Sequence, residues 1–439
     1  MRRSNPDMPG HSVGKPVPEP SWRVRRPGPS RRQVTAALSL LTTSGCTIFR
    51  LDPPPGVSAI DLPILGVENA RFWPDGPPQA MLREAREMTT RQAAALGVSV
   101  EKLPPANFLA LSGGGDNGAF GAGLLNGWTD RGSRPQFDIV TGISAGALIA
   151  PFAFLGPAYD THLRDVFTRI DPSDVLRFRS YVLALLFGEA LADTSPLGRL
   201  IDSFVDETML SAIAQSYSRG RLLLIGTTNL DLQRPVVWNV GAIAASNHPG
   251  ALSLLRRILL ASASIPGAFP PVLVNVEYGG RSWQEMHVDG GAAAQVFLYP
   301  SSLNPGELGR TRALRRERTV WVVRNGRMDV NGASTNRGLL SIASRSVSTL
   351  LHFSGIGDVS RIYLVAIRDG LRFRLSYIGS EFAVDRREPF DPAYMQALFA
   401  YGYAKGRSAE AWVTSPPTAG TGAATDDAAP LAPQASGMP

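Results

Sequence analysis

Ser144 has the sequence surroundings of a catalytic nucleophile. It lies in the segment Gly142-Ile143-Ser144-Ala145-Gly146, which is a Gly-x-Ser-x-Gly pattern. At a strand-to-helix junction, this pattern forms a sharp turn that presents the serine hydroxyl above a sheet. The N–H groups at the start of the following helix then point toward negative charge that develops on a substrate. The pattern predicts that Ser144 is the nucleophile of a serine hydrolase that cleaves acyl esters.

A glycine run upstream could stabilise the charge that such a reaction creates. Gly113, Gly114 and Gly115 follow the short apolar segment 107–111 and open a helix-like segment. Ester hydrolysis passes through a tetrahedral oxyanion, and losing one donor to it typically costs about 2.7–4 kcal/mol. Because glycines carry no side chains, their N–H groups can approach the substrate closely. We therefore expect Gly113, Gly114 and Gly115 to line an oxyanion hole.

Asp289 is the candidate base. It begins the segment Asp289-Gly290-Gly291, directly after the apolar stretch that ends at Val288. A carboxylate that is hydrogen-bonded to a serine hydroxyl can accept its proton. An aspartate with an ordinary pKa near 3.9 is a weak base, so partial burial must favour the protonated form. The apolar residues before Asp289 and the glycines after it are compatible with such a site.

These three segments require a scaffold in which strands alternate with helices. Strand-like patterns occur at 107–111, 137–141, 221–227, 236–240, 319–324, 362–367 and 371–377. Helical patterns occur at 78–96, 116–130, 145–155, 195–205, 251–263, 338–353 and 392–405. Alternating elements of this kind favour an α/β fold with a mainly parallel sheet that is covered by helices on both faces.

The order Gly-Gly-Gly-x-x-Gly, Gly-x-Ser-x-Gly and Asp-Gly-Gly resembles the patatin-like phospholipase family over roughly Ala106 to Arg407. The resemblance implies a three-layer α/β/α fold, a Ser144–Asp289 dyad without a catalytic histidine, and hydrolysis of lipid acyl esters. It implies neither a cofactor nor a metal ion. The remaining motif glycines are Gly118, Gly142, Gly146, Gly290 and Gly291.

The sequence departs from the family pattern at two positions. Ser112 stands where the family often has an aspartate before the glycines, and Asn117 stands where it often has a basic residue. The missing positive charge at position 117 leaves the preference for phospholipids open, whereas it does not affect the hydrolase chemistry.

Two alternative sites are possible. Gly113, Gly115 and Gly118 also fit the dinucleotide-binding pattern Gly-x-Gly-x-x-Gly, and Asp138 lies where a ribose-binding acid is expected. However, that acid belongs at the end of a strand, and Asp138 lies at the start of one. His352 follows Ser144 and Asp289 in the order of a Ser-Asp-His triad, but it lies in a helical pattern typical of structural histidines.

The N-terminal segment has the pattern of an export signal. It holds most of the formal net charge of +7, so the basicity does not indicate a nucleic-acid partner. Arg31 and Arg32, which also resemble a twin-arginine start, precede the apolar segment 34–41 and the small residues before Cys46. This pattern resembles a bacterial lipobox, although Thr43 replaces its usual leucine. We expect Cys46, the only cysteine, to be lipidated and to anchor the protein to the membrane of the cell envelope.

The chain therefore divides into a signal segment (1–45), a tether and lead-in (46–105), a catalytic domain (106–414) and a disordered tail (415–439). Beyond the signal, we expect no apolar run of the ~18 residues that a spanning helix needs. The predicted function is that of a lipid acyl hydrolase of the phospholipase A type, with a membrane surface as partner. The alternatives are a short-chain carboxylesterase or thioesterase, or an inactive relative that binds lipid or protein.

Overall fold

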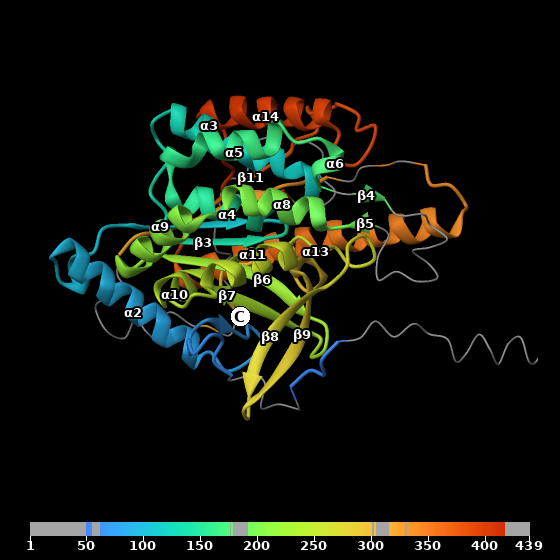
Figure 1. Cartoon of the computed structure of the whole chain (residues 1–439). Coiled ribbons are helices and arrows are strands. Elements are labelled where there is room, and N and C mark those ends of the chain that lie inside the picture. The colour runs from blue at the N-terminus through green and yellow to red at the C-terminus, as the bar shows by residue number, and fades with distance from the viewer. Residues whose placement is uncertain are drawn as a thin grey trace, which may run out of the picture. The chain divides into compact units, whose positions relative to one another are not determined.

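The computed structural model describes residues 50–54, 62–175, 177–178, 192–300, 303, 316–329, 332 and 334–417. Cys46, the predicted signal and most of the predicted tail lie outside these residues. Within them, the chain forms a mixed α/β fold around one large sheet (Figure 1).

The large sheet has nine strands within the described residues and is parallel at its centre. Its path runs β1-β7-β6-β3-β2-β10-β11, and β9 pairs with both β6 and β8. The pairs β6–β3, β3–β2, β2–β10 and β10–β11 are parallel, as the alternation of elements predicts. The bounds are β1 Arg71–Phe72, β2 Ala106–Leu111, β3 Ile139–Ile143, β6 Leu222–Asn229, β7 Arg234–Asn239, β8 Val272–Tyr278, β9 Arg281–Asp289, β10 Arg318–Arg324 and β11 Arg372–Tyr377. A separate pair is formed by β4 (Arg177–Phe178) and β5 (Ala192–Asp193).

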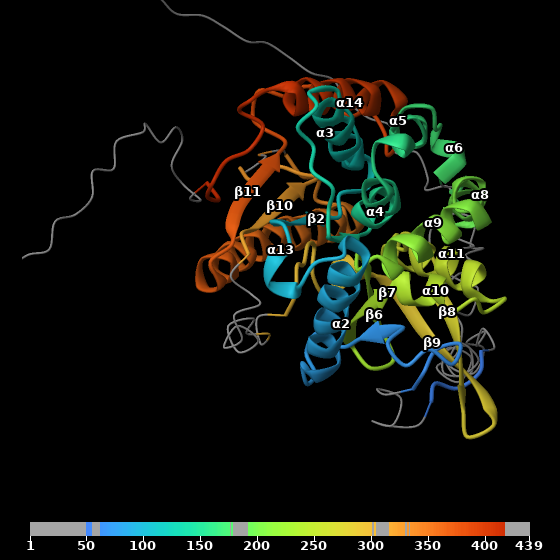
Figure 2. The ribbon, with the colours of Figure 1, turned by 90° about the vertical axis from the view of Figure 1, so that its left-hand side faces the viewer.

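Helices cover both faces of the sheet, as Figure 2 shows for α3 and α4 on one side and α13 on the other. Their bounds are α2 Gln79–Leu96, α3 Gly118–Asp130, α4 Ala145–Leu155, α5 Asp160–Thr168, α6 Pro172–Val175, α8 Ser195–Phe204, α9 Glu207–Ser218, α10 Val240–Ala245, α11 Ala251–Ser262, α13 Leu339–Asp369 and α14 Pro392–Arg407. Strand β2 shows why both faces need cover, because side chains alternate across a strand. Leu109 and Leu111 pack in the same core as α3 and α4, whereas Phe108 and Ala110 pack in the core that contains α13.

Several elements differ from the sequence predictions, and two of the differences concern segments that contribute to the site. The predicted strand 362–367 is wrong, because these residues continue helix α13, which runs from Leu339 to Asp369. A short apolar run has no periodicity that separates a buried strand from a buried helical segment. The antiparallel hairpin of β8 and β9, which carries Asp289, was not predicted as a pair.

Part of the predicted tether and lead-in is integral to the folded body. Strand β1 pairs with β7, and Phe72 packs with Met88 of α2 in a buried cluster. Buried Arg71 donates to Glu285 of β9 with an Nη1–Oε2 distance of 2.6 Å. The described residues 71–96 therefore support the strand that ends at Asp289.

Candidate active site

Ser144 occupies the turn between β3 and α4, and the backbone there is strained. Its φ of 55° and ψ of −125° are rare for a residue with a side chain. A Cβ atom at position 142 would collide with the carbonyl oxygen of Gly146, and one at position 146 would collide with that of Leu111. The two flanking glycines are therefore a steric requirement of the turn that presents Ser144.

The hydroxyl group of Ser262, the last residue of α11, supports the turn through two hydrogen bonds. The backbone N–H of Ser144 donates to Oγ of Ser262 at 3.0 Å, and the Ser262 hydroxyl donates to the carbonyl oxygen of Gly226 at 2.7 Å. Ser262 is fully buried at the end of its helix. This support was not predicted from the sequence, since a serine in an amphipathic helix carries no pattern that points to a site.

Asp289 reaches Ser144 because of the register of the sheet. Asp289 is the last residue of β9 and pairs with Thr227 of β6, which lies beside β3. Its carboxylate accepts the N–H of Gly291 at 2.7 Å and hydrogen-bonds the Ser144 hydroxyl. Burial raises the pKa of Asp289 to about 7, against the lowering effect of these two hydrogen bonds. The structure thus brings together the two residues that the sequence analysis paired.

The glycine loop offers fewer free donors than the sequence suggested. The N–H of Gly113 donates to the carbonyl oxygen of Gln295 at 2.9 Å, so the prediction that it serves the oxyanion hole is corrected. The hydrogen bonds of the described residues leave the N–H groups of Gly114 and Gly115 without a protein acceptor. Both glycines line the same cavity as Ser144 and Asp289.

The end of strand β10 fixes this loop. Asn325 bonds Ser112 twice, from its N–H to Oγ and from Nδ2 to the carbonyl oxygen, each at 2.8 Å. Nη1 of Arg324 donates to Oγ of Ser112 and to the carbonyl oxygen of Gly113, each at 3.3 Å. Burial lowers the pKa of Arg324 to about 10. Sequence analysis missed both residues, although a polar pair where an apolar strand ends, at the carboxyl edge of a parallel sheet, is a recognisable signal.

The cavity around Ser144 has a volume of about 790 Å³ and two kinds of wall. Apolar side chains form one part, namely Ile265, Phe269, Leu351, Phe353 and Phe390. Four arginines contribute to the remainder, namely Arg324, Arg327, Arg345 and Arg386. Arg386 also pairs with Asp116 at 2.9 Å, next to the position where the family often has a basic residue. The cavity can hold an apolar chain beside Ser144 and an anionic group near the arginines.

His352, His287 and Asp138 do not have the catalytic or dinucleotide-binding roles considered for the alternatives. His352 lines the cavity, but no hydrogen bond of the described residues links it to Ser144 or Asp289. Burial lowers the pKa of His352, and its Nε2 has no hydrogen-bond partner among the described residues. His287, which lies two residues before Asp289 on β9, contacts Thr227 and Glu285. Asp138 accepts the N–H of Asn107 at 2.7 Å before β3 begins, which does not fit the dinucleotide alternative.

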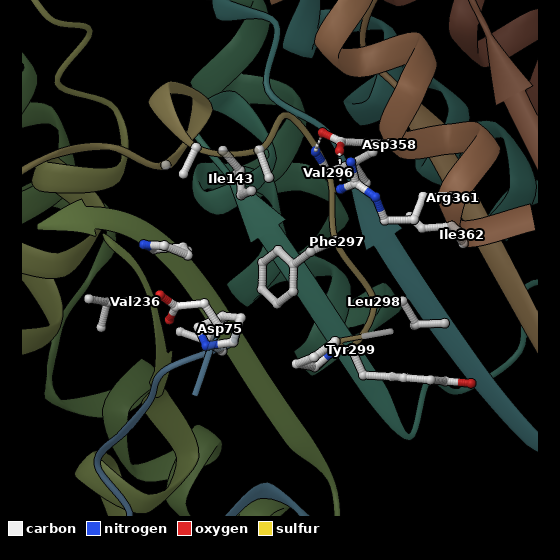
Figure 3. Close-up of a pocket in the computed structure, with 18 of the residues that line it drawn as sticks. Asp75, Ile143, Val236, Val296, Phe297, Leu298, Tyr299, Asp358, Arg361 and Ile362 are labelled. Carbon is white, nitrogen blue, oxygen red and sulfur yellow. Dashed lines mark hydrogen bonds and ion pairs between the residues drawn. The ribbon is translucent and has the colours of Figure 1, made fainter. Parts of the chain in front are cut away.

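A second, smaller cavity of about 300 Å³ lies against the neighbours of the two candidate residues. Ile143 and Gly290 line it, and Phe297 points into it (Figure 3). One of its two carboxylates, Asp358, pairs with Arg361 at 2.8 Å and accepts the N–H of Gln295 at 2.7 Å. Asp358 therefore anchors Gln295, which in turn accepts from Gly113. This cavity contains neither Ser144 nor Asp289, so we regard it as packing behind the site.

The described residues hold no group of three or more His, Cys, Asp or Glu side chains that could bind a metal ion.

Comparison with family models gives a match over part of the chain. Residues 109–300 match the model of the family described as patatin-like phospholipase. This segment contains Ser144, Asp289 and all of the motif glycines, and the match supports a lipid hydrolase in general terms. No curated protein sequence matches the chain.

Three solved structures have low similarity to the chain. VipD from Legionella pneumophila is 10% identical with a TM-score of 0.33, and the match covers 70% of this chain and 67% of that one. Human GIVD cytosolic phospholipase A2 is 11% identical with a TM-score of 0.28, over 64% and 51%. ExoU of Pseudomonas aeruginosa, in its complex with SpcU, is 16% identical with a TM-score of 0.25, over 57% and 50%. The chain thus spans between half and two thirds of these proteins. By the family match, residues 109–300 form a patatin-like phospholipase domain.

Proposed function

We propose that the protein hydrolyses acyl esters of lipids, as a phospholipase A or related lipid acyl hydrolase, with Ser144 as nucleophile and Asp289 as base. One observation carries the proposal. The Ser144 hydroxyl is hydrogen-bonded to a buried carboxylate whose pKa is raised to about 7, on the wall of a partly apolar cavity. A base with a pKa near the working pH is the most effective for general acid–base catalysis.

In the first half of this reaction, Oγ of Ser144 attacks the ester carbonyl carbon while its proton passes to Asp289. The resulting oxyanion accepts hydrogen bonds from the N–H groups of Gly114 and Gly115. When the intermediate collapses, the alcohol leaves with the proton held by Asp289, and the acyl group remains on Ser144.

In the second half, Asp289 takes a proton from a water molecule that attacks the acyl-enzyme. A second oxyanion forms in the same place, because the carbonyl group has not moved. Its collapse releases the fatty acid, and the proton returns from Asp289 to Oγ of Ser144. The cycle therefore needs no second base, which agrees with the absence of a described hydrogen bond from His352 to either residue.

The cavity supports a lipid as substrate in preference to a small ester. Its volume of about 790 Å³ and its apolar wall suit an acyl chain, because ligand sites bury most of an apolar ligand. The arginine wall supports an ester that carries a phosphate, since guanidinium groups bind phosphate through paired hydrogen bonds. A short-chain esterase or thioesterase would leave most of this cavity unfilled.

A substrate panel tests this proposal. The panel compares p-nitrophenyl esters of increasing chain length with micellar phosphatidylcholine and phosphatidylglycerol, using Ser144→Ala as control. We expect kcat/KM to increase with chain length, fatty acid to be released from the phospholipids, and all activity to be lost in Ser144→Ala. Activity limited to short esters or thioesters would favour the alternative enzymes. Failure of folded protein to react with a fluorophosphonate probe at Ser144 would favour an inactive relative.

We also propose, from the sequence alone, that Cys46 is lipidated and holds the protein in a bacterial cell envelope. Mass spectrometry of the mature N-terminus tests this proposal. A diacylated cysteine as first residue supports it, whereas an unmodified chain that begins before Cys46 would contradict it.

A further inference from the structure

Helix α13 carries an exposed apolar stripe along its whole length. Seven large apolar side chains of this helix are 48% to 82% exposed, and all of them except Val347 share one face, namely Leu339, Ile342, Leu350, Phe353, Leu364 and Ile367. They form three pairs with a spacing of three residues, and the pairs follow one another after 11 and 14 residues. At 100° per residue these spacings place all six side chains within about 100° of the helix circumference. We call these six residues the α13 stripe.

The opposite side of the same helix is fixed to the protein core. Val359, Ile362 and Ala366 are almost fully buried and pack in the core that contains β2, β10 and β11. By length and composition, Ser341–Asp369 could cross a membrane, which corrects the expectation that no such segment exists beyond the signal. Its packed face argues against a spanning position. The core instead holds the C-terminal half of α13 as a surface helix with an uncovered apolar side, whereas residues 341–350 are exposed on every face.

The charges on α13 favour an anionic surface over a second copy of the chain. Arg361 and Arg368, whose side chains are 64% and 40% exposed, lie on the helix beside the stripe. Each arginine is ion-paired at 2.8 Å with an acidic residue of the helix, Asp358 or Asp369, whose side chains are only 4% and 2% exposed, so the guanidinium is the exposed end of each pair. Two stripes facing each other would bring arginines together, whereas anionic lipid headgroups would attract them.

We propose that the α13 stripe lies on an anionic lipid bilayer, with its apolar side chains inserted among the headgroups and its arginines at their level. A helix with this composition binds at a membrane interface through buried apolar area and attraction to anionic lipids. The stripe continues into the cavity wall, because Phe353 belongs to both and because Leu351 and His352, which lie between Leu350 and Phe353 in the sequence, also line the cavity. Docking would therefore place the cavity next to the bilayer. That last consequence rests on the proposed function, whereas the docking itself does not.

Vesicle binding of the full-length chain tests the proposal. The parent protein carries Cys46→Ser, which removes any lipid anchor, and Ser144→Ala, which prevents hydrolysis of the vesicles. Cosedimentation uses phosphatidylcholine vesicles with and without about one third of phosphatidylglycerol. We expect binding to the anionic vesicles that weakens with salt, and a decrease in the double variant Leu350→Glu/Leu364→Glu of on the order of tenfold for each leucine.

The matched control is Leu96→Glu, which changes a leucine that is 55% exposed on α2. It is expected to bind as the parent protein does. With Ser144 restored, the double variant should hydrolyse a soluble short-chain ester at the normal rate, because neither leucine lines the cavity. If hydrolysis of the soluble ester were lost while vesicle binding behaved as predicted, the result would count against the proposed function and not against the docking. Unchanged vesicle binding in the double variant would overturn the docking proposal. So would the finding that the parent protein is a dimer that dissociates in the double variant.

Discussion

The substitution Asp289→Asn should remove activity and at the same time stabilise the protein at alkaline pH. Asp289 is 4% exposed, and its pKa rises from 3.8 to about 7 because burial disfavours the charged form. At 1.36 kcal/mol per pKa unit, ionising this group in the folded state costs about 4 kcal/mol more than in the unfolded state. An asparagine of the same shape avoids this cost, although it cannot accept the proton of Ser144.

The sign and the pH range follow from the two pKa values. Between pH 3.8 and about 7 the folded protein holds a proton on Asp289 that the unfolded chain releases, so the stability of the wild type falls as the pH rises. The asparagine variant lacks this dependence. Relative to the wild type, it should therefore gain about 3 kcal/mol in free energy of unfolding between about pH 5 and about pH 8.5.

Urea unfolding of both proteins at the two pH values measures this difference. Contributions from all other titrating groups cancel, because they are common to the two proteins. A difference between the proteins that stays constant with pH would show that the carboxyl group titrates normally. Our account of Asp289 as a base with a raised pKa would then be refuted, even if the variant were inactive.

Three further predictions concern the same site. With a soluble ester, kcat/KM should fall about tenfold per pH unit below about 7, because only ionised Asp289 accepts a proton; a flat profile down to pH 5 would contradict this. Arg324→Gln should lower kcat by about 10- to 100-fold with little change in KM, since it loosens the loop that carries the oxyanion donors, and an unchanged kcat would exclude that role. Ser262→Ala should reduce the free energy of unfolding by about 1–3 kcal/mol, because it leaves the Ser144 N–H and the Gly226 carbonyl without partners. Ser218→Ala, which alters an exposed hydroxyl, is the control for urea unfolding and should have no such effect.

The parallel centre of the sheet and the Ser144 turn could be predicted because each depends on local sequence. Apolar runs such as 107–111, followed by glycines and helical periodicity, identify strands and their junctions wherever they lie in the fold. The turn at Ser144 also requires glycines at positions 142 and 146, so the geometry of the turn can be predicted from these residue types.

The partners of the site could not be predicted, because they come from distant segments. Gln295, which occupies the N–H of Gly113, and Ser262, which supports Ser144, have no local pattern of their own. The β8–β9 hairpin had a usable signal in Gly279-Gly280, two residues with positive φ between strand-like segments. The length of α13 had no usable signal in the sequence. The run at 362–367 is apolar throughout, so it has neither the periodicity of a helix nor that of a strand.

The place of β10 in the sheet has a consequence for how the chain folds. β2 lies between β3, which follows it closely, and β10, whose Arg318 pairs with Ala106 across about 200 residues of sequence. During synthesis, one edge of β2 must therefore remain open until β10 emerges, after the whole segment that matches the family model has been made. Such a long-range contact slows folding and exposes an unpaired strand in the meantime. A fragment that ends at residue 300 would keep both candidate catalytic residues and yet lack β10 and β11, the two strands that extend the sheet beyond β2.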